Sequence, residues 1–254
     1  MAVVCGLAAA LLALAILWSR WRLLPKPPAD RSYDLAMHAN RAVAVLHALI
    51  MALVFAEAEI DYTRARESVW READLLHDVF RGLSLYGSDK AEEISVQVAD
   101  YTRSLAETEW GLLSENQLSD QASQQFQAAY TAVLHLATSD AAQTWLRDQI
   151  LASMTQLSGL RHERFFEAHD RLPVIFWLII VLGYLLLCGL FSIYAKTRLN
   201  MAILATFGFF FGLVSYLIFA FEDPFDGHLG VTAKPLVLLY DEVMAPTIAA
   251  RGDG

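Results

Sequence analysis

The sequence predicts an all-α integral membrane protein with four transmembrane helices and a large extramembrane helical bundle inserted between the second and the third. Apolar residues make up 56% of the 254 residues and charged residues 19%, whereas soluble domains average about 45–50% and about 25%. The apolar residues are gathered into long runs without charge, and the polar segment between them shows apolar positions at helical spacing. Together these observations exclude a disordered chain and argue against an ordinary soluble enzyme.

Three uncharged runs are each long enough for a helix to cross about 30 Å of hydrocarbon: Met1–Ser19, Leu172–Ala195 and Leu199–Phe221. A fourth run, Ala42–Ala56, is shorter and reaches a spanning length when its helix continues to Ile60. The first run lacks a basic N-terminal region and a small-residue cleavage site, so we expect a membrane anchor and not a cleaved signal peptide.

Positive charges in the short loops bear on the orientation of the spans. The connections Arg20–Arg41 and Lys196–Arg198 carry an excess of Lys and Arg, and four spans place both connections on one side of the membrane. Because positive loops tend to face the cytoplasm, both termini and the middle segment would then lie outside. Arginines also lie near the opposite ends of the spans: Arg64, Arg66, Arg71, Arg161, Arg164 and Arg171. The charge bias is therefore nearly balanced, and it leaves open which side of the membrane holds the middle segment.

Charge and spacing define the middle segment. Glu57–Arg171 holds 20 acidic and 10 basic residues, so this segment accounts for the whole negative net charge of the protein, which is −9. Its apolar residues recur at helical spacing, with breaks or helix N-caps expected at Gly82, Gly87, Ser88, Ser119 and Ser139. We therefore divide the chain into a first transmembrane pair, an extramembrane bundle, a second transmembrane pair and a C-terminal turn and tail, at residues 1–60, 61–171, 172–221 and 222–254.

Enzyme motifs are missing from the sequence, which has no Gly-rich phosphate loop, Gly-x-Ser-x-Gly elbow, His-Glu-x-x-His or Cys-x-x-Cys. We expect no enzymatic activity, no cofactor and no metal. His162 and Glu163, with Arg161 and Arg164 around them, are expected on a solvated, salt-bridged helix. The negative net charge argues against nucleic acid as a partner. An excess of 15 Arg over 4 Lys is compatible with a bacterial gene, and hence with the inner (cytoplasmic) membrane of a bacterium.

His47 is the ionisable residue that lies well inside a predicted span. Intramembrane ionisable groups usually face a bundle interior or a water path, so His47 is a candidate pore-lining or proton-relay residue. The alternative is a neutral histidine that hydrogen-bonds to a neighbouring helix. Glu57 and Glu59, just beyond this span, either form a ring at a pore mouth in an oligomer or mark the membrane interface.

The last span carries small residues on one helical face, at positions Ala205, Gly208, Gly212 and Ser215. Small residues let helix backbones approach closely in lipid, where packing drives association. We therefore expect a helix-packing seam, either within the chain or between subunits.

Several short motifs in a fixed order resemble the bestrophin-like family of uncharacterised, mostly bacterial membrane proteins. Two spans, a helical segment and two further spans occur in the order typical of that family. The motifs are Glu72-Ala73, Tyr101 followed by Glu109-Trp110, Arg161-x-x-Arg164, Pro173, and Asp223-Pro224-Phe225-x-Gly227. The resemblance implies a distant relation to bestrophins, which are pentameric chloride channels whose second spanning helix lines a hydrophobic neck.

Two hypotheses for the function follow. The first is an oligomeric ion channel of bestrophin-like build, in which the second spanning helix lines the pore and His47 faces water. The alternative is a non-conducting, membrane-anchored scaffold or binding protein that acts through its acidic helical bundle. The expected partners are membrane lipid, further copies of the chain (a pentamer, if the resemblance extends that far) and, for a channel, a small ion.

Overall fold

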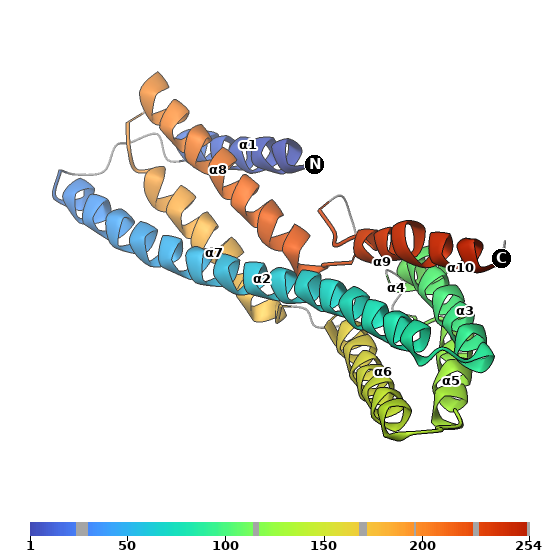
Figure 1. Ribbon diagram of the computed structural model, residues 1–254. Coiled ribbons are helices and arrows are strands. Elements are labelled where there is room, and N and C mark those ends of the chain that lie inside the picture. Colours follow the sequence, from blue (N-terminus) through green and yellow to red (C-terminus); the bar gives the residue numbers. More distant parts are fainter. Residues whose placement is uncertain (24–29, 114–116, 168–171, 196, 226–228, 253–254) are drawn as a thin grey trace. The chain divides into compact units, whose positions relative to one another are not determined.

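A computed structural model describes residues 1–23, 30–113, 117–167, 172–195, 197–225 and 229–252 (Figure 1). The chain divides into two compact units. The membrane unit comprises Met1–Asp61 and Arg171–Glu222, and the bundle unit comprises Tyr62–Asp170 and Asp223–Gly254. The C-terminal segment therefore groups with the bundle unit.

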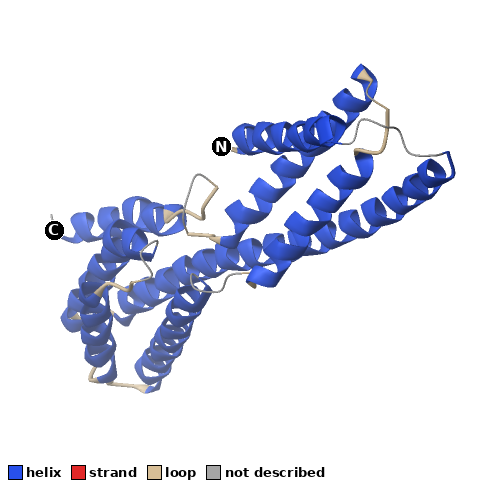
Figure 2. Ribbon diagram, turned by 180° about the vertical axis from the view of Figure 1, so that it is seen from behind, coloured by secondary structure: helices blue, strands red, loops and turns tan. Residues whose placement is uncertain are grey.

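The membrane unit is built from α1 (Ala2–Leu23), the first part of α2 (Asp30–Tyr86), α7 (Val174–Phe191) and α8 (Arg198–Glu222). All four helices are long and apolar enough to cross a membrane. The short apolar run Ala42–Ala56 forms part of the 57-residue helix α2, so the helix continues past Ile60 as expected. Figure 2 shows that the regular structure of the described residues is helical throughout. The prediction of an all-α chain with four candidate spans is therefore confirmed.

Glycines in α8 let this helix lie directly against α1. A Cβ atom on Gly212 would come within 2.5 Å of the Cys5 carbonyl oxygen, and one on Gly208 within 2.9 Å of the Cα atom of Ala10. The packing seam expected from the small residues therefore lies within the chain. Ala205 and Ser215, the other two members of the expected seam, are half-buried.

A methyl group at Gly212 should overpack this seam and destabilise the membrane unit. We expect Gly212→Ala to lower the free energy of unfolding by about 1–3 kcal/mol. Gly189→Ala in α7 is the matched control, because a Cβ atom there meets nothing within 4 Å. Thermal unfolding of the full chain in detergent measures both variants, and equal midpoints would show that α1 and α8 do not pack this closely.

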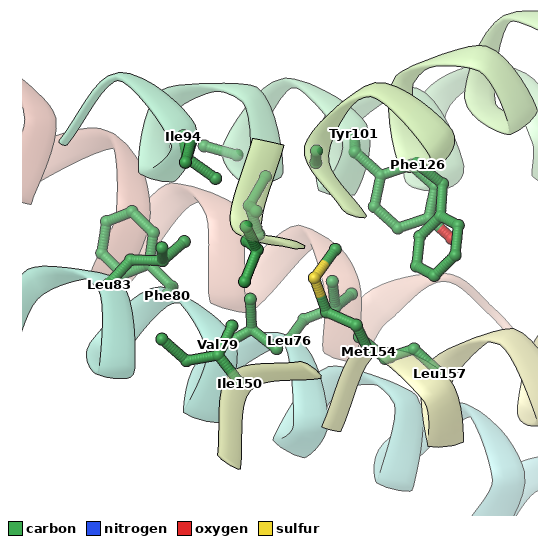
Figure 3. Packing of buried hydrophobic residues seen from close by; sticks show 14 of the residues in the cluster. Leu76, Val79, Phe80, Leu83, Ile94, Tyr101, Phe126, Ile150, Met154 and Leu157 are labelled. Atoms are coloured by element: carbon green, nitrogen blue, oxygen red, sulfur yellow. The ribbon is translucent and has the colours of Figure 1, made fainter. Parts of the chain in front are cut away.

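The bundle unit combines the second part of α2 with short helices and two π-helical turns. Its other elements are α3 (Asp89–Ser104), η1 (Leu105–Glu109), α4 (Trp110–Leu113), α5 (Asp120–Leu134), α6 (Ala141–Glu167), α9 (Lys234–Leu239), η2 (Tyr240–Met244) and α10 (Ala245–Gly252). Their apolar faces share one core, in which Leu76, Ile94, Phe126, Ile150 and Met154 come from α2, α3, α5 and α6 (Figure 3).

Local sequence signals explain where several bundle helices begin and end. Gly87 has a positive φ of 68°, which permits the break after α2. The expected N-caps at Ser88 and Ser119 are confirmed, since their hydroxyl oxygens accept hydrogen bonds from the N–H groups of Ala91 and Ala122, both at 3.2 Å.

Two residues that were predicted to mark helix ends, Ser139 and Gly82, do not do so in the structure. The cap of α6 is Asp140 and not Ser139, because the Asp140 carboxylate accepts the N–H of Gln143 at 2.7 Å. Gly82 lies inside α2 and not at a break. A Cβ atom on Gly82 would come within 2.8 Å of Ile150 Cγ1, so this glycine allows close packing of α2 on α6.

The C-terminal segment packs against the same core. Leu236 and Met244 are fully buried there. Arg251, near the end of α10, donates hydrogen bonds to the hydroxyl groups of Ser84 at 2.8 Å and Ser95 at 3.3 Å. These contacts fix the last helix on α2 and α3.

Candidate functional site

Within the membrane unit, α2 has a buried face and an exposed face. Met51, Val54 and Ala58 are buried in a cluster with residues of α7 and α8. On the other face, Leu46, Leu49 and Leu53 have exposed fractions of 58%, 67% and 68%. Because these three residues are spaced by three and four positions, they form one continuous apolar stripe along the helix. We call these three residues the exposed stripe.

His47 lies on the buried face of α2. Its side chain is only 5% exposed, and its ring stacks on Phe211 of α8 at a centroid distance of 5.8 Å. A Cβ atom on Gly183 of α7 would overlap the His47 ring, so this glycine makes the room for it. This placement differs from the expectation that His47 faces water. The physical reason is that packing against α7 and α8 keeps a polar ring away from lipid.

Glu57 and Glu59 both lie on exposed positions of α2, on either side of the buried Ala58. Glu57 follows Leu53 by four residues, which places it in line with the exposed stripe. Glu59 lies on a different side of the helix. Glu57 is therefore the acidic residue that shares a face with the exposed stripe.

The bundle unit contains a buried cluster of four charged residues: Glu72 of α2, Glu109 of η1, and Arg161 and Arg164 of α6. Each is at most 8% exposed. All four belong to the motifs on which the family resemblance rests, although they are far apart in the sequence. We call them the charge cluster. The prediction of a solvated helix face around His162 is wrong for Arg161 and Arg164, which are buried, while His162 and Glu163 are exposed.

Glu109 is the carboxylate of the charge cluster with the more complete set of hydrogen bonds. Its carboxylate accepts hydrogen bonds from Arg161 at 2.5 and 3.1 Å, from Arg164 at 2.7 Å and from the N–H of Ser119 at 3.2 Å. Arg161 also donates to the carbonyl oxygen of Ser119 at 3.1 Å and to the hydroxyl of Ser123 at 3.0 Å. This carboxylate therefore joins η1 to both α5 and α6.

Glu72 has a less complete set of partners. Arg164 donates a hydrogen bond to its Oε2 atom. Among the described residues, no group donates to its Oε1 atom. Glu72 and Glu109 therefore share Arg164, but only Glu109 is hydrogen-bonded on both oxygens.

The two carboxyl groups have pKa values displaced in opposite directions. Burial raises the pKa of Glu72, and the nearby charge of Glu109 adds to this, while Arg164 and Arg161 offset only part of it. Burial acts in the same direction on Glu109. There, however, the hydrogen bonds and charges of Arg161 and Arg164 outweigh burial and hold the pKa below its usual range.

Trp110 connects the charge cluster to the C-terminal segment. The Arg164 guanidinium lies over the Trp110 ring, 5.5 Å from its centroid. The indole N–H donates to the carbonyl oxygen of Val231 at 3.2 Å, and the Phe225 ring packs edge-on at 5.8 Å. The backbone of the turn closes where the Val231 N–H donates to the Pro224 carbonyl at 2.6 Å.

The remaining residues of the family motifs lie outside the charge cluster. Ala73 is buried in the bundle core, and Pro173 immediately precedes the start of α7, where its missing N–H costs no helical hydrogen bond. Asp223 is half-buried and Pro224 is buried in the turn after α8. Gly227 lies outside the described residues.

Sequence reasoning missed two features of the charge cluster. The first is the π-helical turn η1, which ends at Glu109 and precedes Trp110; π-helical turns often occur at functional sites, but no sequence pattern marked this one. The second is the role of the Ser119 N-cap, whose backbone N–H also binds the Glu109 carboxylate. The cap itself was visible in the sequence, but its second contact depends on the tertiary fold.

A comparison with known protein families identifies the family of this chain. The sequence signature of the Bestrophin-like domain matches residues 7–236. The chain belongs to the bestrophin-like family. The resemblance seen in the sequence motifs is thereby confirmed, and membership supports the assignment of the chain as a membrane protein.

Solved structures share the bestrophin-like fold over almost the whole chain. A crystal structure of a bacterial bestrophin homologue from Klebsiella pneumoniae matches with a TM-score of 0.68 at 11% identity, covering 98% of this chain and 99% of that chain. A point variant of the Klebsiella homologue matches with a TM-score of 0.67 at 12% identity, covering 96% and 98%. At these identities the likeness shows the fold alone. A comparison with curated protein sequences gives no significant match.

Proposed function

We propose that this bestrophin-like protein is a subunit of an oligomeric ion channel in which copies of α2 surround the pore. The observation that carries the proposal is the exposed stripe of α2, an apolar helix face that no other described segment of the membrane unit covers. In a ring of subunits, this face would line the axis. The relation to bestrophins supports the same helix as the pore helix.

The composition of the exposed stripe suits a hydrophobic constriction. Leu46, Leu49 and Leu53 in a ring would form a narrow apolar passage, which controls ion flow by excluding water. Glu57 would add a carboxylate ring one turn beyond Leu53 and attract cations to that end of the pore. His47 has no place on this face, because its ring packs between α7 and α8. We therefore propose Leu46, Leu49, Leu53 and Glu57 as the pore-lining residues.

Ion flux through proteoliposomes tests the proposal. The native protein should conduct, and Leu53→Ser should increase the flux several-fold, because a hydroxyl group helps water to enter the constriction. Leu182→Ser in α7 is the matched control, since Leu182 is also an exposed leucine of a spanning helix and should leave the flux unchanged.

The size of the protein in detergent provides a second, independent measurement. A channel requires a complex of several subunits, so light scattering should give a multiple of 28.3 kDa. A monomer without flux would overturn the channel proposal. It would favour the alternative of a membrane-anchored scaffold that acts through its acidic bundle.

A further inference from the structure

Three polar atoms around the charge cluster receive or donate no hydrogen bond among the residues that the structure describes. They are Oε1 of Glu72, the hydroxyl of Tyr101 and Nε of Arg164. The three side chains are at most 2% exposed and come from three different elements, α2, α3 and α6. Buried polar groups are usually hydrogen-bonded, so their common location requires an explanation.

The distribution of hydrogen-bond donors explains why Glu109 stays ionised more readily than Glu72. Glu109 takes the hydrogen bonds of Arg161, Arg164 and Ser119 and is stable as an anion. Glu72 receives a hydrogen bond on one oxygen only, from an arginine that it shares with Glu109. An oxygen without a donor inside a dry core favours the neutral form of its carboxyl group.

We propose that Glu72 is a proton-binding site of the bundle unit, with its proton on the unpartnered Oε1 atom and the unpartnered Tyr101 hydroxyl as the acceptor of its hydrogen bond. A proton from water adds to the carboxylate, and the carboxyl group then donates a hydrogen bond to the Tyr101 hydroxyl through one water molecule, because no direct hydrogen bond joins the two groups. The carbonyl oxygen of the same carboxyl group still accepts a hydrogen bond from Arg164. This proton site does not depend on the channel function.

Each element packed around Glu72 contributes a charged or titratable group. Tyr101 comes from α3, Glu109 from η1, and Arg161 and Arg164 from α6. Burial raises the pKa of Tyr101, and the charge of Glu72 raises it further.

Protonation of Glu72 changes the net charge of the cluster from zero to plus one. The face of the Trp110 ring, over which the Arg164 guanidinium lies, stabilises the extra positive charge. This cation–π contact offsets part of the cost of the extra buried charge.

Infrared spectroscopy of the full chain in detergent tests the proposal directly. A protonated carboxyl group has a carbonyl band that an ionised carboxylate lacks. We expect the wild-type protein to show such a band above pH 5, where an ordinary glutamate with a pKa of about 4.3 is mostly ionised. The band should disappear in Glu72→Gln and persist in Glu67→Gln, an exposed glutamate on the same helix.

A second variant keeps the test decisive if Glu72→Gln fails to fold. In Tyr101→Phe, the neutral carboxyl group loses the hydroxyl that accepts its hydrogen bond, so the band should disappear at a lower pH than in the wild type. The absence of a protonated carboxyl band above pH 5 in the wild-type protein would overturn the proposal. So would a band that is unchanged in Glu72→Gln.

Discussion

Replacing Glu109 by glutamine should lower the free energy of unfolding by about 3–5 kcal/mol, because removal of one partner from a buried ion pair leaves an uncompensated charge. The effect falls at the upper end of this range, since two arginines, Arg161 and Arg164, lose their shared anion. Chemical unfolding of the full chain in detergent, followed by circular dichroism, measures the loss.

Glu107→Gln is the matched control for this substitution. Glu107 lies in the same π-helical turn, but its side chain is 61% exposed, where it pairs with Arg103. An exposed ion pair of this kind contributes about 0–1 kcal/mol. If both substitutions cost the same, Glu109 cannot be the anion that neutralises the two buried arginines.

The pH dependence of unfolding should carry opposite contributions from the two carboxyl groups. The pKa of Glu109 is depressed in the folded protein, so its contribution is present above the unfolded pKa of about 4.3 and is lost as the pH falls. The pKa of Glu72 is raised, so the folded state binds its proton more tightly, and stability falls as the pH rises from that value. Subtracting the unfolding curves of Glu109→Gln and Glu72→Gln from that of the wild type separates the two slopes.

Much of the membrane unit could be predicted from hydropathy alone, because a spanning helix needs only length and the absence of charge. The orientation of the side chains on α2 could not. The stretch Ala42–Ala56 is apolar on all sides, so no periodicity distinguishes the face of Leu49 from the face of His47. The fit of the His47 ring beside Gly183, with the packing of Met51 and Val54 on α7 and α8, decides which side faces the protein.

The charge cluster shows a different limit of sequence reasoning. The family motifs named Glu72, Glu109, Arg161 and Arg164, but not their chemistry. In the sequence each charge is indistinguishable from the many solvated ones of the acidic middle segment, and 92 residues separate Glu72 from its partner Arg164. Helical periodicity could indicate that these positions face inward, but the pairing depends on how α2, η1 and α6 pack.

Phe225→Ala should destabilise the bundle unit by about 3–5 kcal/mol, the range for a fully buried phenylalanine. The ring is 6% exposed, packs in one cluster with Val69 and Leu113, and lies edge-on to Trp110. Its loss leaves a cavity beside the indole that covers Arg164, so we also expect a change in tryptophan fluorescence. Phe166→Ala, at a position that is 66% exposed, should change stability by less than about 0.5 kcal/mol. An unchanged unfolding midpoint for Phe225→Ala would mean that this ring serves an exposed contact and does not close the turn over the charge cluster.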